Sequence, residues 1–200
     1  MKQAKLFIIC IVLGFCSCSK KNDVNQNDNF GINEVAINQV LQAKNPSEQK
    51  SMYKLLNQYE KTEIWKRKYK SILSSKDLSS EQRNFIIKIQ NLITPDIFSP
   101  SVLLSKKSFD DTEIKALAIK LFGVSDAHSL LTSIVSTPFI QQYATLSSDC
   151  GCSKDSDWCS GALVCQNAGC ASSGGCGTFW VYSCNGNCQK QDIYIIPIAP

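Results

Sequence analysis

The residues best suited to chemistry are eight cysteines within thirty-nine residues near the C-terminal end of the sequence. Their order is Cys-x-Cys-x6-Cys-x5-Cys-x4-Cys-x5-Cys-x7-Cys-x3-Cys, and mostly Gly, Ser, Asn and Ala lie between them. A segment this short cannot bury enough apolar surface to offset the entropy of ordering it, so it needs metal thiolates or disulfides. The eight are Cys150, Cys152, Cys159, Cys165, Cys170, Cys176, Cys184 and Cys188.

The spacing of these cysteines favours disulfides over zinc. Zinc sites are usually built from close Cys-x2-4-Cys pairs, whereas the middle four cysteines here stand alone. The only histidine, His128, lies outside the segment. We therefore expect four intramolecular disulfides, no metal and no cofactor, with zinc thiolates as the alternative. The sequence does not give the pairing, although Cys150 and Cys152 are too close together to bond to each other easily.

The N-terminus predicts export to an oxidising compartment, where disulfides persist. Lys2 and Lys5 precede an apolar run of ten residues, Leu6 to Phe15, which is too short to span a bilayer and typical of a signal peptide. A buried helix or short membrane anchor is the alternative. Ser17-Cys18 resembles the end of a bacterial lipoprotein signal, which is cleaved just before a cysteine that receives a lipid. We expect a signal peptide over residues 1–17.

The cysteine count agrees with lipidation at Cys18. Cleavage before Cys18 removes Cys10 and Cys16, and the eight C-terminal cysteines can then all pair. Cleavage before Cys16 would instead leave Cys18 as an odd thiol. Residues 18–29 are polar, and we expect them to form a tether between the lipid and the folded part.

Residues 30–146 carry apolar side chains at helical spacing and predict a helical domain, a small bundle of five short amphipathic helices. The clearest stripe runs from Phe85 to Ile93, opened by a capping box from Ser79 to Gln82 and closed by Pro95. The other stripes are Met52–Tyr59, Ile64–Leu73, Ile114–Phe122 and Leu130–Val135, the last two separated at Gly123.

Residues 149–200 predict a second unit, an eight-cysteine module of loops with a small sheet in which Ile193–Ile198 pairs with Thr178–Ser183. The expected fold is thus a small α-helical bundle followed by a disulfide-rich, loop and β module. We expect the two parts to fold separately. The polar residues between them are where proteases cut, so Leu146, Ser147 and Ser148 are candidate processing sites.

Enzymatic motifs are missing from the sequence, which has no His-Glu-x-x-His, no Gly-x-Ser-x-Gly and no Gly-rich phosphate loop. We therefore do not expect an enzyme. The basic run Lys61–Lys70 is better explained as the solvated face of a helix whose aromatic residues point inward than as a nucleic-acid site. His128 has no nucleophile or carboxylate at motif spacing and is expected to be structural.

The residues between the cysteines resemble a known family. The resembling blocks in the module are Cys150–Ser153, Ser156–Cys159, Gly175–Tyr182 and Cys184–Asn187, and those in the helical part are Glu60-Lys61-x3-Trp65 and Leu78-Ser79-x-Glu81-Gln82. They are similar to fulvocin C-related bacteriocins, which are disulfide-bonded and secreted. The resemblance implies an exported precursor whose helical part acts as a pro-region. Its module would be the antimicrobial effector, acting on a bacterial membrane or surface receptor.

Three aromatic residues of the module, Trp158, Phe179 and Trp180, are candidate contacts with that target, because rigid rings bury a large area at a small entropic cost. Alternatively, these rings pack as the module's own core. From Asp149 onward two lysines face four aspartates, so the module is not a cationic membrane-lytic peptide. A non-toxic cell-surface lipoprotein, which uses the module for binding or as a protease-resistant knob, therefore remains open as a second function.

The first prediction concerns Cys18. In the Cys18→Ala variant the mature protein should be released from the membrane, or its maturation should stop, because the residue that receives the lipid is lost. Partition of the exported protein between the aqueous and detergent phases measures this. Unchanged recovery in the detergent phase of a variant that has been cleaved to its mature size would contradict lipidation at Cys18.

Overall fold

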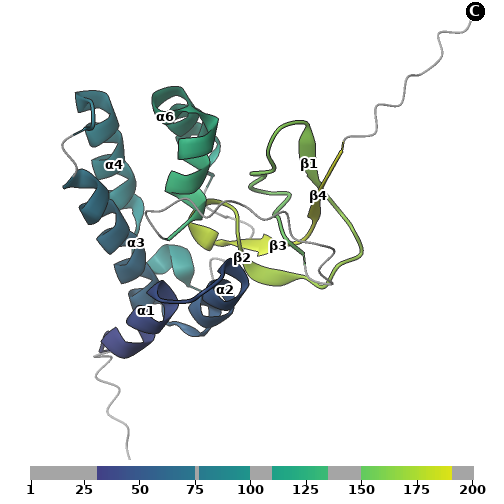
Figure 1. Ribbon diagram of the computed structural model, residues 1–200, viewed down its shortest axis with the longest axis horizontal. Helices are drawn as coiled ribbons and strands as arrows, with labels where there is room; N and C mark the ends of the chain where they lie inside the picture. Colours follow the sequence, from purple (N-terminus) through teal and green to yellow (C-terminus); the bar gives the residue numbers. More distant parts are fainter. Residues whose placement is uncertain (1–30, 75–76, 100–109, 135–149, 191–200) are drawn as a thin grey trace, which may run out of the picture. The chain divides into compact units, whose positions relative to one another are not determined.

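A computed structural model describes residues 31–74, 77–99, 110–134 and 150–190 of the chain (Figure 1). The predicted signal peptide, Cys18, the tether, the processing sites Leu146, Ser147 and Ser148, and the strand Ile193–Ile198 lie outside these residues. Within the described ranges, none of the helices combines the length and the apolar character that crossing a membrane requires.

Five α-helices form in the N-terminal part, and they follow the predicted apolar stripes with one addition. The addition is α1, whose short amphipathic stripe the sequence analysis did not identify. The helices are α1 (Glu34–Leu41), α2 (Pro46–Leu55), α3 (Gln58–Leu73), α4 (Ser80–Leu92) and α6 (Thr112–Thr132), with a 3₁₀ turn, η1 (Pro95–Phe98), after α4. The two last predicted stripes are the two halves of α6, which is kinked at Gly123.

Capping boxes start two of these helices. Ser79 and Gln82 form the predicted box at α4. At α3, the side chain of Asn57 accepts hydrogen bonds from the first turn, and Glu60 Oε2 accepts from Asn57 N at 2.8 Å. The other oxygen of Glu60 accepts from Asn33 N at 3.2 Å, so one buried carboxylate fixes the starts of both α1 and α3.

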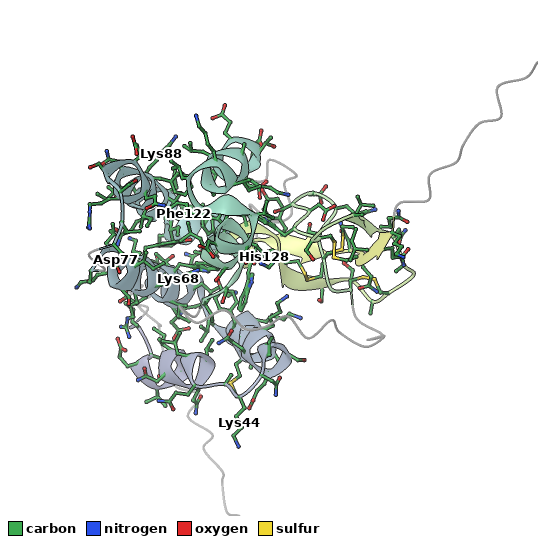
Figure 2. All side chains as sticks on the ribbon, turned by 45° about the horizontal axis from the view of Figure 1, so that its top comes forward. Lys44, Lys68, Asp77, Lys88, Phe122 and His128 are labelled. Carbon is green, nitrogen blue, oxygen red and sulfur yellow. A yellow bond between two sulfur atoms is a disulfide. The ribbon has the colours of Figure 1, made fainter. Side chains whose placement is uncertain are left out.

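The basic run on α3 is only partly the solvated face that the sequence predicted. Trp65 and Tyr69 point inward as expected, but Lys68 is also buried, 5% exposed, and lies among the helices (Figure 2). Its Nζ donates to the carbonyls of Ser129 and Leu130 at 2.8 and 2.7 Å and to that of Ser133. Burial lowers the pKa of Lys68. Through these hydrogen bonds the side chain of Lys68 acts as a tertiary C-cap for α6.

The C-terminal part holds four short strands and one 3₁₀ turn. They are β1 (Leu163–Gln166), β2 (Ser173–Cys176), η2 (Thr178–Trp180), β3 (Tyr182–Cys184) and β4 (Asn187–Lys190). Strands β1 and β4 pair antiparallel with Cys165 opposite Cys188, and β2 and β3 pair antiparallel with a bulge between Gly174 and Cys176. The predicted fold class, helices followed by a disulfide-rich loop and β module, is confirmed.

The two parts share one hydrophobic core, although the sequence analysis expected them to fold separately. The cluster of buried side chains that fills the helical part also contains Phe179, Trp180, Val181 and Tyr182 of the module. Helix α6 contacts η2, and α2 contacts β2, so the loop between β2 and β3 lies against the helices (Figure 1). The helical stripes alone therefore do not complete the core.

The second prediction concerns Glu60. Replacing it with Ala leaves the backbone N–H groups of Asn33 and Asn57 without their acceptor, which should cost about 1–3 kcal/mol of unfolding free energy. Urea denaturation of the exported protein measures this. Glu63→Ala is the matched control, because it removes only a half-exposed ion pair to Arg67 and should cost at most about 1 kcal/mol. Equal losses in the two variants would contradict the role of Glu60.

Candidate functional site

All eight predicted cysteines form disulfides in the structure. The pairs are Cys150–Cys170, Cys152–Cys165, Cys159–Cys188 and Cys176–Cys184, with Cα–Cα distances of 5.1 to 5.9 Å. These distances are usual for disulfides. Cys150 and Cys152 bond to different partners, as predicted. Four disulfides in so short a segment indicate an exported protein that folds in an oxidising setting.

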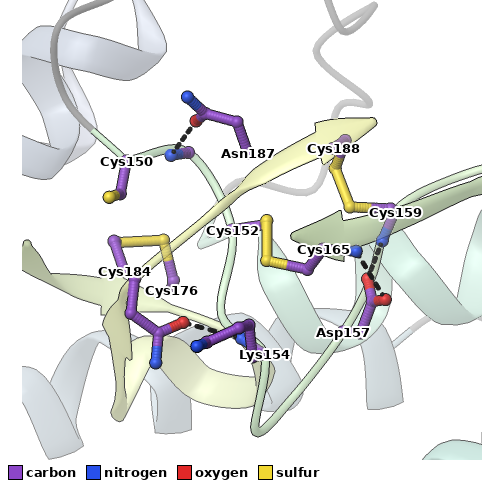
Figure 3. Close-up of a disulfide and its surroundings, with 12 residues drawn as sticks. Cys150, Cys152, Lys154, Asp157, Cys159, Cys165, Cys176, Cys184, Asn187 and Cys188 are labelled. Atoms are coloured by element: carbon purple, nitrogen blue, oxygen red, sulfur yellow. Dashed lines mark hydrogen bonds between the residues drawn. A yellow bond between two sulfur atoms is a disulfide. The ribbon is translucent and has the colours of Figure 1, made fainter. Parts of the chain in front are cut away.

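The arrangement of the sulfur atoms also bears on the zinc alternative. Among the described residues, Cys152, Cys159 and Cys165 form a group whose Sγ atoms all lie within 4.8 Å of one another. This closeness arises because the disulfides Cys152–Cys165 and Cys159–Cys188 lie side by side (Figure 3). Both sulfur atoms of each pair are used in covalent bonds, so the oxidised module offers no thiolate from this group to a metal.

Short polar side chains hold the module's loops together where it has little apolar core. Asp157 accepts from Cys159 N through Oδ1 and from Cys165 N through Oδ2, both at 2.8 Å. Asn187 accepts from Gly151 N, and Asn185 accepts from Lys154 N, each also at 2.8 Å (Figure 3). Each of these bonds gives a side-chain acceptor to a backbone N–H of the module's loops and strands.

The Cys176–Cys184 disulfide closes the loop that enters the helical part. We call residues 177–182 the aromatic loop. The ring of Phe179 is fully buried and meets Trp65 edge-on with centroids 5.4 Å apart. Trp180 is 8% exposed and meets Tyr53 edge-on at 4.9 Å. Its indole Nε1 donates to the carbonyl of Thr132 at the end of α6, at 2.6 Å.

The backbone of the aromatic loop adopts conformations that ordinary residues rarely do. Phe179 and Trp180 have φ of 55° and 58°, in the left-handed region, which costs about 1–3 kcal/mol for each residue. Gly177 before them has φ of 68°, and a Cβ there would lie 2.6 Å from Ser156 and Tyr182. Burial of the two rings in the helical part compensates for this strain, and only glycine fits at position 177.

A buried carboxylate connects the aromatic loop to the helices. Asp111, at the start of α6, is 5% exposed. Ser156 Oγ donates to it at 2.6 Å, and the hydroxyl of Thr178 donates to the same oxygen. Burial, followed by the charge of Asp111, raises the pKa of Tyr182. Because an unpaired buried charge is costly, this network fixes the module on α6.

Trp158, the third predicted contact residue, lies beside this network. Its Nε1 donates to Thr178 Oγ1 at 2.9 Å. Lys115 Nζ lies 4.7 Å from its ring centroid, and the ring of His128 meets it edge-on at 5.6 Å. Burial, helped by Lys50, Lys115 and Lys68, lowers the pKa of His128. His128 is thus half-buried beside the module, which agrees with a structural role.

The structure brings the three predicted contact residues, Trp158, Phe179 and Trp180, to the boundary between module and helices. Phe179 and Trp180 are covered there, so in the intact chain they do not face a target; contact after separation of the parts stays a prediction. The sequence analysis missed Asp111, Ser156, Thr178 and Gly177. Asp111 comes just before the predicted stripe Ile114–Phe122, and nothing in the sequence around it shows that the hydroxyl groups of Ser156 and Thr178 reach it.

Comparisons with family models, curated proteins and solved structures found no match to this chain. The fulvocin C-related resemblance therefore stays a prediction.

The third prediction concerns Gly177. In Gly177→Ala the added methyl group meets Ser156 and Tyr182 and the backbone is strained, so the protein should lose at least about 2 kcal/mol of unfolding free energy. Tryptophan fluorescence followed through denaturation reports this loss, since Trp65 and Trp180 lie at the affected boundary. Gly174→Ala is the control, because its Cβ would meet nothing within 4 Å. Similar behaviour of both variants would contradict the tight fit at Gly177.

Proposed function

We propose that this protein is an exported, lipid-anchored precursor of the fulvocin C-related kind, in which the helical part keeps the disulfide-rich module in a latent form. The module is the effector, and its target is a bacterial membrane or surface receptor. The observation that carries the proposal is the insertion of Phe179 and Trp180 into the core of the helices. An effector surface that is covered by its own precursor is inactive until it is uncovered.

The covered surface is of the kind that binds a partner. Buried aromatic side chains each remove about 150–250 Å² from water, and they are enriched among residues that dominate binding energy. When the module separates from the helices, Phe179 and Trp180 lose their contacts with Trp65 and Tyr53. Two large rings then become exposed next to the half-buried Trp158, and such an apolar patch favours association with a membrane or protein.

Proteolysis alone does not uncover the loop. The candidate processing sites Leu146, Ser147 and Ser148 precede the module, so a cut there removes only the covalent connection. The hydrogen bonds to Asp111 and to the carbonyl of Thr132 and the ring contacts all remain. Latency therefore depends on how tightly the module and the helical part bind each other. Activation requires both the cut and the dissociation of the two parts.

The same network favours a second candidate function, a non-toxic cell-surface lipoprotein. If the bonds to Asp111 and the buried rings hold the parts together permanently, the module is a covalently stapled portion of one domain that resists proteolysis. Its acidic character agrees with this function, because an excess of aspartates does not favour accumulation on anionic lipid. The two functions differ in whether the module leaves after the cut.

The fourth prediction tests this difference with the exported Cys18→Ala protein carrying a specific protease site within residues 141–149. After cleavage, size-exclusion chromatography should show release of the module, and the released module should bind or inhibit neighbouring bacteria, whereas the uncut protein should not. Asp111→Ala should increase the released fraction, because it weakens the boundary without altering the module. Asp110→Ala is the control: Asp110 is the exposed neighbour of Asp111, and its replacement should leave the released fraction nearly unchanged.

Two outcomes would contradict the precursor function. If the cut parts stay together even in Asp111→Ala and bind no cells, the permanent surface domain is supported instead. If the module is released but is as inert as the uncut protein, the helical part does not conceal an effector.

A further inference from the structure

Two disulfides of the module, Cys152–Cys165 and Cys159–Cys188, lie next to each other and apart from the aromatic loop. The proposed function gives them no role beyond holding the module together. None of these four cysteines belongs to the aromatic loop or to the disulfide that closes it. We propose that Cys159–Cys188 is a thiol-exchange site that reacts with a low-molecular-weight thiol, and that Cys152–Cys165 is its internal exchange partner. The proposal is independent of whether the module is an effector.

Exposure distinguishes Cys159–Cys188 from the other disulfides. Cys188 lies on β4 and is exposed, and Cys159 is half-buried. Each of the other three disulfides has at least one buried member, and in Cys176–Cys184 both residues are only 2% exposed. A thiolate in solution attacks a disulfide along the S–S axis and needs access to one sulfur atom. Cys188 therefore offers the most accessible point of attack.

Proximity then allows the exchange to continue inside the module. The Sγ atoms of Cys152, Cys159 and Cys165 lie within 4.8 Å of one another. The carboxylate of Asp157 maintains this closeness, because it binds the backbone N–H groups of Cys159 and Cys165, which belong to different disulfides (Figure 3). A thiolate released at Cys159 is thus already beside the second disulfide.

The register of β1 and β4 brings together the last two cysteines of the exchange, Cys165 and Cys188. Cys165 and Cys188 are directly opposite each other on β1 and β4, although they are bonded to other cysteines. Opposite residues of an antiparallel pair have Cα atoms about 4.5–5.5 Å apart, which lies within the disulfide range, and their side chains share one face of the ribbon. The observed pairing is Cys152–Cys165 with Cys159–Cys188. The alternative, Cys152–Cys159 with Cys165–Cys188, would join two sulfur atoms that already lie close together and two cysteines that are already opposite each other.

The reaction is an exchange in which no net oxidation occurs. An external thiolate forms a bond to Cys188 Sγ, the Cys159–Cys188 bond breaks, and its electron pair leaves on Cys159 as a thiolate. Cys159 then attacks Cys152, forming Cys152–Cys159 and releasing Cys165 as a thiolate. Finally Cys165 attacks Cys188, forming Cys165–Cys188 and expelling the external thiolate. If the reaction stops before this last step, the small thiol stays attached at Cys188.

The fifth prediction follows from this sequence of steps. The exported Cys18→Ala protein is incubated with glutathione, trapped by acid and alkylation, and its linked peptides are identified by mass spectrometry. Glutathione should appear on Cys188 before it appears on any other cysteine, and peptides linking Cys152 to Cys159 should accumulate with it. Cys150–Cys170 and Cys176–Cys184 should remain intact over the same time.

Two double variants, each with an even number of cysteines, serve as matched controls. In Cys159→Ser with Cys188→Ser the entry point is missing, so Cys152–Cys165 should survive the same glutathione treatment. In Cys150→Ser with Cys170→Ser the exchange should proceed as in the parent protein. Should either variant fail to fold, the order of reaction in the parent protein still decides. Simultaneous opening of all four disulfides, first modification at another cysteine, or capping of Cys188 without any Cys152–Cys159 linkage would overturn the proposal.

Discussion

The structure depends on the insertion of two aromatic rings from a disulfide-closed loop into the core of a helical bundle. Phe179 and Trp180 pack edge-on against Trp65 and Tyr53, and these contacts are made across the boundary between two compositionally different halves of the chain. The bundle gains the rings that complete its core. The module, which is too small to build a core of its own, gains a place to bury its largest side chains. The helical part therefore needs the rings of the module, and the module needs the core of the helical part.

The remaining features can be understood as support for this insertion. The Cys176–Cys184 disulfide closes the loop at its base, and Gly177 lets the chain pass Ser156 and Tyr182. Asp111 then fixes the loop by accepting hydrogen bonds from Ser156 and Thr178. The left-handed backbone at Phe179 and Trp180 is strained, and the packing of both rings in the helical core holds it in place.

Much of the architecture could be predicted because its signals are local. Apolar periodicity located α2, α3, α4 and α6, Ser79 and Gln82 identified the start of α4, and cysteine density predicted complete disulfide formation. The pairing could not be predicted, since it depends on which loops meet in space. The buried roles of Lys68 and Asp111 were missed for the same reason: their partners lie on other elements, and a charged residue is usually exposed. The shared core escaped prediction because two adjacent stretches with different compositions resembled two independent domains.

The position of the aromatic loop in the chain also determines when the helices can finish folding. Export proceeds from the N-terminus, so α1 to α6 emerge well before Phe179 and Trp180. Until then Trp65 and Tyr53 lack the rings that cover them in the folded protein. The contacts between Trp65 and Phe179 span more than half of the chain, which is the kind of long-range closure that slows folding. The core of the bundle is therefore complete only after the loop closed by Cys176 and Cys184 has been made and has packed against it.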